Sequence, residues 1–230
     1  MQRKCKAVMR FKAVFFDLDG TLANSLEDLA ASTNYVLKKH GFPVRETAEF
    51  RYFAGDGIAK MLARAMPQEA VNDASVDALK AEFLEYYACH FADRTVAYDG
   101  LGDLLARLKE QGVKLAVVTN KAQPMADLVV PKLFGDIFDL VSGMREGIPA
   151  KPDPTGLFLA MEALSVKPEE SAFVGDTAMD IAVGVNAGAY PIGVLWGFRG
   201  KEELERAGAR AFATDAAQLL QILSEEENAK

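Results

Sequence analysis

The sequence contains few of the residues that form disulfides and transition-metal sites. Its 230 residues include two cysteines and two histidines. Cys5 and Cys89 have no paired spacing, and His40 and His90 have no second ligand at metal-site spacing. We therefore expect neither a disulfide framework nor a histidine or cysteine metal site. A chain of this length can bury a sufficient core without such cross-links.

Long hydrophobic runs and an excess of positive charge are also absent. The apolar runs are too short to span a bilayer, and the N-terminal segment lacks the apolar stretch of a secretory signal. We expect a cytoplasmic protein without a membrane partner, either a monomer or a homodimer. Lysine and arginine total 26 against 33 acidic residues, for a net charge of −7, which argues against a nucleic-acid partner.

Short apolar runs and helical patterns alternate over much of the chain. Runs rich in β-branched and aromatic residues predict buried strands within 13–16, 115–118, 138–141, 172–174 and 192–194. Helical patterns separate the later strands, which is typical of a parallel sheet with helices on both faces.

Residues 25–94 show helical periodicity throughout, and the pair Ser25 and Asp28 resembles a capping box. The prediction is a Rossmann-like doubly wound α/β core at 11–23 and 95–226, with an inserted α-helical cap domain at 24–94.

Polar side chains are concentrated where the predicted strands end, the edge at which parallel sheets bind ligands. They are Asp17 and Asp19 after the first strand, Thr119 and Asn120 after the second, Asp176 and Asp180 after the fourth, and Lys151 in a loop. Four carboxylates beside one lysine repel each other unless protons or a cation offset the charge. Because only oxygen ligands are present, Mg²⁺ is the expected cation.

A site of this composition favours phosphoryl chemistry. One carboxylate can act as nucleophile, a second can donate a proton to the leaving oxygen, and Lys151 with a metal can hold the phosphate. Gly20 and Thr21 follow the first acids, and their backbone N–H groups are expected to turn toward the phosphate. The expected ligand is a small phosphorylated metabolite.

Four segments resemble the motifs of the haloacid dehalogenase superfamily, in order and at ordinary spacing. They are FFDLDGTLANS at 15–25, VVTNK at 117–121, KPDP at 151–154 and VGDTAMD at 174–180. The resemblance covers nearly the whole chain after the first ten residues and places 24–94 where that family has a C1-type cap. It implies that Asp17 forms an aspartyl-phosphate and that Asp19 is the acid and base.

The same resemblance implies roles for the remaining site residues. Mg²⁺ would be held by Asp17, the backbone carbonyl of Asp19, and Asp176, with Asp180 orienting Lys151 or a metal-bound water. Thr119 would bind a phosphoryl oxygen with the support of Asn120, and Lys151 would balance the charge of Asp17 and the phosphate.

Residues 41–66 resemble the cap entry of the phosphoglycolate phosphatase-like branch. Gly55 and Gly57 flank a turn before a helix whose N-terminus could receive an anionic group, and Arg51 and Lys60 are candidate anion contacts. We expect a Mg²⁺-dependent phosphatase for a small phosphomonoester, with 2-phosphoglycolate as the first candidate. A β-phosphoglucomutase-like sugar phosphomutase and a pyrophosphatase are alternatives on the same scaffold. A receiver-like signalling domain fits less well, because it is much shorter and needs no helical insert.

Overall fold

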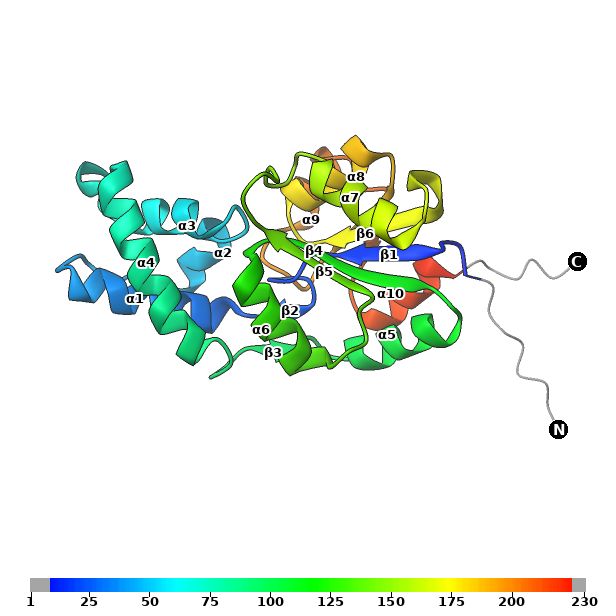
Figure 1. Ribbon diagram of the computed structural model, residues 1–230, viewed down its shortest axis with the longest axis horizontal. Coiled ribbons are helices and arrows are strands. Elements are labelled where there is room, and N and C mark those ends of the chain that lie inside the picture. The colour runs from blue at the N-terminus through cyan, green and yellow to red at the C-terminus, as the bar shows by residue number, and fades with distance from the viewer. Residues whose placement is uncertain (1–8, 225–230) are drawn as a thin grey trace, which may run out of the picture.

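The computed structural model describes residues 9–224 and consists of a sheet region and a helical insert (Figure 1). The predicted core residues 225–226 lie outside the described residues. Six parallel strands form the main sheet in the order β5-β4-β1-β6-β7-β8. Their bounds are β1 Ala13–Phe16, β4 Lys114–Ala122, β5 Leu140–Met144, β6 Ser171–Gly175, β7 Tyr190–Val194 and β8 Ala211–Ala213. The chain order reverses at β1, which makes a topological switch point.

Helices cover both faces of this sheet. On one face are α5 (Leu101–Glu110), α6 (Gln123–Phe134) and α10 (Ala216–Leu223), and on the other are α7 (Thr155–Leu164), α8 (Ala178–Ala187) and α9 (Lys201–Arg206) (Figure 1). Side chains of β1 alternate between the two apolar layers, because Phe16 packs on the α5 and α6 side and Phe15 on the α7 and α8 side. The predicted doubly wound α/β fold is confirmed.

The helical insert has an apolar cluster of its own. It comprises α1 (Leu26–Lys39), α2 (Phe50–Phe53), α3 (Ile58–Ala65) and α4 (Asp73–His90), with 3₁₀ turns η1 (Thr47–Glu49) and η2 (Gln68–Ala70); a third turn, η3 (Pro168–Glu170), lies in the sheet region. Val36, Leu62 and Phe83 are buried in the insert's cluster, to which the sheet region contributes Met125 and Phe198. The strands β2 (Ala23–Asn24) and β3 (Val96–Ala97) pair where the chain enters and leaves the insert.

The structure confirms the five predicted strands, although β5 begins at Leu140, two residues later than expected. The edge strand β8 was not predicted, since its three residues do not form a long apolar run. No helix within residues 9–224 has both the length and the apolar character needed to cross a membrane.

The predicted capping box at the start of α1 is wrong. The Ser25 hydroxyl donates to Asp19 and accepts no hydrogen bond from the first turn of the helix, and the Asp28 carboxylate accepts from the backbone N–H groups of Arg94 and Thr95. Both side chains that the local pattern assigned to the cap are used by partners from other parts of the fold.

Candidate active site

The parallel register brings three chain segments to one edge of the sheet. Phe16 at the end of β1 is aligned with Val117 of β4 and with Val174 of β6. Asp17, Thr119 and Asp176 therefore lie close together just beyond this level. The pairing of β4 with β5 is irregular between Val118 and Ala122, which releases the intervening polar residues from the regular ladder.

A tight turn after β1 fits closely against the Asp176 side chain. Gly20 has a φ of +88°, and a Cβ atom at this position would overlap the Asp176 carboxylate. The backbone N–H of Gly20 donates to the Ala23 carbonyl and that of Thr21 to the Leu18 carbonyl. The expectation that these two N–H groups face a phosphate is therefore wrong, because the turn itself uses them.

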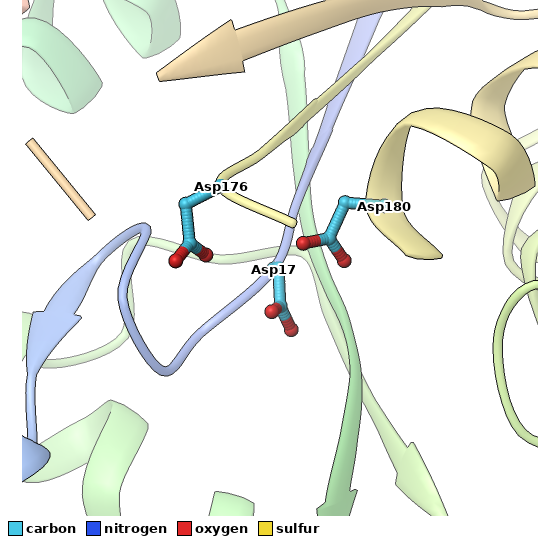
Figure 2. A group of neighbouring side chains, drawn as sticks. All are labelled: Asp17, Asp176 and Asp180. Carbon is cyan, nitrogen blue, oxygen red and sulfur yellow. The ribbon is translucent and has the colours of Figure 1, made fainter. Parts of the chain in front are cut away.

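Three buried carboxylates converge at this edge: Asp17, Asp176 and Asp180 (Figure 2). Each offers an oxygen, and these oxygens all lie within 4.8 Å of one another. Burial, with repulsion from Asp180, raises the pKa of Asp17 to about 6, although Lys151 opposes the shift. Burial and the neighbouring carboxylates also raise the pKa of Asp176 well above its ordinary value. A divalent cation would relieve this repulsion, and an all-oxygen donor set fits Mg²⁺.

Asp176 is held in place by two neighbours. The Thr21 hydroxyl donates to its Oδ1 at 2.8 Å, and the backbone N–H of Phe198 donates to its Oδ2 at 2.8 Å. Thr21, predicted to bind substrate, thus positions a carboxylate of the acidic cluster.

Lys151 connects two of the three carboxylates. Its buried Nζ lies 2.8 Å from Asp17 Oδ1 and 2.6 Å from Asp180 Oδ1. Burial disfavours the charged amine, but Asp17 and Asp180 outweigh this effect and raise the pKa of Lys151 above its ordinary value. The backbone N–H of Lys151 donates to Asn120 Oδ1 at 2.8 Å, which fixes the loop to β4. Lys151 is therefore a charged and rigidly held group.

Asp180 also fixes the start of α8. Its Oδ2 accepts from the backbone N–H of Thr177 at 2.9 Å and from the Thr177 hydroxyl at 2.7 Å. The other oxygen holds Lys151, which agrees with the orienting role that the resemblance implied. Because α8 follows β6 directly, this capping box ties Lys151 to the strand that carries Asp176.

A second series of polar contacts connects the turn after β1 to the helical insert. Lys121 Nζ lies 3.1 and 3.0 Å from the two Asp19 oxygens, and it donates to the Tyr87 hydroxyl of α4 at 2.9 Å. The Ser25 hydroxyl donates to the same Asp19 carboxylate at 2.6 Å. Burial opposes the charge of Lys121, yet Asp19 and Tyr87 raise its pKa above the ordinary value.

A cavity lies between the acidic edge of the sheet and the insert. Asp17, Asp19 and Thr119 line it from the sheet, and the loop before α3 closes it from the other side. Asn120 Nδ2 donates to the Gly55 carbonyl at 3.1 Å, so this loop rests directly on β4. The site is therefore shared between the sheet region and the insert.

Residues 14–194 match the family model of haloacid dehalogenase-like hydrolases. This chain belongs to that family. It is 33% identical over 192 residues to a phosphoglycolate phosphatase from Pseudomonas putida, covering 81% of this chain and 70% of the relative. It is also 33% identical over 191 residues to an N-acetylmuramic acid 6-phosphate phosphatase from Pseudomonas aeruginosa, covering 83% of this chain and 84% of that protein.

A solved structure agrees with this assignment. The crystal structure of a proposed phosphoglycolate phosphatase from Lactobacillus delbrueckii subsp. bulgaricus superposes with a TM-score of 0.89 at 30% identity, covering 95% of this chain and all of the other. This haloacid dehalogenase-like hydrolase is accordingly a phosphoric monoester hydrolase, similar to phosphoglycolate phosphatases.

The structure of this hydrolase brings together most of the predicted site residues, but not all of them. Gly55 and Gly57 line the cavity. Arg51 and Lys60 are exposed and do not line it; Lys60 borders a separate depression with Ala63 and Val71. Because α3 turns Ile58 and Met61 toward the cavity, Lys60 points to the opposite side of the helix.

Lys121 is the site residue that the sequence reasoning missed. It lies in the VVTNK segment, for which the resemblance implies roles only for Thr119 and Asn120. A usable signal is present, because a lysine at the end of an apolar, buried strand requires a carboxylate partner. The identity of that carboxylate follows only from the fold.

Proposed function

We propose that this hydrolase is a Mg²⁺-dependent phosphatase that acts on a small phosphomonoester through an aspartyl-phosphate on Asp17, with 2-phosphoglycolate as the first candidate substrate. One observation carries the proposal: the buried Asp17 carboxylate lies among Asp176, Asp180 and Lys151 and also lines the cavity that contains Asp19. The phosphoglycolate phosphatases among the relatives support the choice of substrate.

The residues around Asp17 fit a magnesium ion. Asp17, Asp176 and the backbone carbonyl of Asp19 would hold it. An oxygen of Asp180 lies within 4.8 Å of the Asp17 and Asp176 oxygens. Four carboxylates against two ammonium groups, Lys121 and Lys151, leave an excess of two negative charges when all are ionised, which one divalent cation would offset. When bound, the ion would stabilise negative charge on the transferring phosphoryl group.

The side chains then divide the chemistry between them. An oxygen of Asp17 attacks phosphorus and the bond from phosphorus to the ester oxygen breaks, while Asp19, which has to carry a proton when the substrate is bound, gives that proton to the ester oxygen. Asp19 next takes a proton from water, which attacks the aspartyl-phosphate and releases inorganic phosphate and free Asp17. Lys151 holds Asp17 and counters the charge of the phosphate, and Thr119 donates to a phosphoryl oxygen.

We further propose that residues 24–94 act as a cap on a core formed by 11–23 and 95–226. The paired strands β2 and β3 join the two parts, and the cavity lies between them. Opening and closing of such a cap admits the substrate and excludes water. A cytoplasmic location, the absence of nucleic-acid and membrane partners, and a monomeric or homodimeric state stay predictions.

A substrate panel tests this proposal. Release of inorganic phosphate is measured from 2-phosphoglycolate, N-acetylmuramic acid 6-phosphate, glucose 1-phosphate and pyrophosphate, each with Mg²⁺ and with a chelator. The expected result is Mg²⁺-dependent release that is fastest from 2-phosphoglycolate. Conversion of glucose 1-phosphate to the 6-phosphate without phosphate release would indicate a phosphomutase, and release from pyrophosphate alone would indicate a pyrophosphatase.

A further inference from the structure

Lys121 places a buried positive charge beside the proposed acid, on the wall of the cavity. Its side chain is 3% exposed, and its Nζ lies 3.0 Å from Asp19 Oδ2 and 2.9 Å from the Tyr87 hydroxyl. An ammonium group has three N–H donors. Its acceptors are both Asp19 oxygens, at 3.1 and 3.0 Å, and the Tyr87 hydroxyl. When a single N–H bridges the two Asp19 oxygens, the third N–H can turn to a ligand in the cavity that Lys121 lines.

The remaining wall on the insert side is largely apolar. Leu29, Ile58, Met61 and Phe83 line it, and Met125 adds a further apolar side chain from α6. Among the described residues of this wall, the insert supplies one polar side-chain group, the Tyr87 hydroxyl. A leaving group with several hydroxyls would lose hydrogen bonds to water here and gain few side-chain partners, which costs binding energy.

The position of Lys121 relative to Asp19 limits where an anionic group can lie on the substrate. Asp19 must contact the ester oxygen to protonate it, and Lys121 contacts Asp19. The positive charge is therefore within a few ångströms of that oxygen. A carboxylate on the carbon attached to the ester oxygen is held close to that oxygen and hence to Lys121, whereas one placed further along the leaving group can extend toward the apolar wall.

We infer that Lys121 determines specificity by binding the carboxylate of a 2-(phosphonooxy)carboxylate, the class to which 2-phosphoglycolate belongs. This inference rests on the proposed function, because it requires Asp19 to face the leaving oxygen. It assigns to Lys121 the anion contact that the sequence suggested for Arg51 and Lys60, whose side chains do not line the cavity.

The test compares kcat/KM for three monoesters of similar size: 2-phosphoglycolate, 3-(phosphonooxy)propanoate and ethyl phosphate. The wild-type enzyme should prefer 2-phosphoglycolate to both others. Lys121→Met removes the charge at similar length and should reduce kcat/KM for 2-phosphoglycolate by about 10- to 100-fold more than for ethyl phosphate. Lys121→Arg keeps the charge and should retain a preference for the carboxylate. The ratio of kcat/KM between two esters is calculated for each variant separately, so a smaller fraction of folded enzyme affects both values equally and cancels.

Two results would overturn the inference and leave the phosphatase assignment intact. One is a wild-type enzyme that hydrolyses ethyl phosphate or 3-(phosphonooxy)propanoate as well as 2-phosphoglycolate. The other is an equal loss for all three esters in Lys121→Met, which would mean that Lys121 acts only by positioning Asp19. Failure to release phosphate from any ester in the presence of Mg²⁺ would overturn the proposed function together with the inference.

Discussion

The carboxylate of Asp28 accepts two hydrogen bonds from Thr95, one from its backbone N–H at 2.8 Å and one from its hydroxyl at 2.7 Å. The two residues are 67 positions apart, and both are buried. Asp28 lies near the start of α1 and Thr95 just before β3. The two segments that connect the helical insert to the sheet are therefore tied to each other by one buried carboxylate.

Asp28→Ala should destabilise the protein by about 2–4 kcal/mol, because it leaves buried donors of Thr95 without a partner. Urea unfolding measures the effect. Glu27→Ala is the matched control, because the adjacent Glu27 forms an exposed pair with Arg94 and its loss should cost less than about 1 kcal/mol. Equal effects of the two substitutions would show that the buried contact contributes little to stability.

The raised pKa values of Asp17 and Asp176 predict how metal binding depends on pH. In the metal-free protein, the folded-state pKa of Asp17 lies near 6, above its ordinary value. The stability that its protonated form contributes is therefore lost as pH rises through about 6, where the carboxylates repel each other. Mg²⁺ should raise Tm more at about pH 8 than at about pH 5, since protons compete with the metal.

Thermal unfolding with Mg²⁺ and with a chelator at both pH values provides this measurement. Asp176→Asn keeps the shape of the side chain and should lose most of the Mg²⁺-dependent gain in Tm. A gain that is the same at both pH values would mean that Mg²⁺ binds elsewhere.

Gly20→Ala should impair the site and destabilise the fold by about 1–3 kcal/mol, because the residue has a positive φ and its Cβ would overlap Asp176. We expect phosphatase activity to fall by at least about 100-fold as the carboxylate is displaced. Gly41→Ala serves as the control, since Gly41 has a φ of +72° and no atom near the added Cβ. Gly41→Ala should also lose some stability, because alanine disfavours a positive φ, but it should keep full activity. Comparable activity losses in both variants would contradict a steric role for Gly20.

The parts of the site that the sequence predicts are those that parallel strands determine directly. Residues that follow buried strands meet at one sheet edge, so Asp17, Thr119 and Asp176 could be predicted from the apolar runs before them. The contact between Lys121 and Tyr87 could not, because it depends on how α4 is placed over β4.

Local patterns were least reliable where a side chain has a distant partner. Ser25 and Asp28 have the spacing of a helix cap, but Asp19 and Thr95 take up their hydrogen bonds. Lys60 is near Gly57 in sequence, but the helical periodicity of α3 directs it away from the cavity. That outcome could have been predicted from the spacing of the apolar residues of α3 alone.

Acid quenching detects transfer of the phosphoryl group to Asp17. Wild-type enzyme and Asp17→Asn are mixed with Mg²⁺ and 2-phosphoglycolate that is radiolabelled in its phosphoryl group. The mixtures are quenched in acid and assayed for label on the protein and for free phosphate. We expect labelled wild-type protein with steady phosphate release, and neither label nor release from a folded Asp17→Asn protein. Phosphate release by Asp17→Asn at a rate close to wild type would contradict phosphoryl transfer to Asp17.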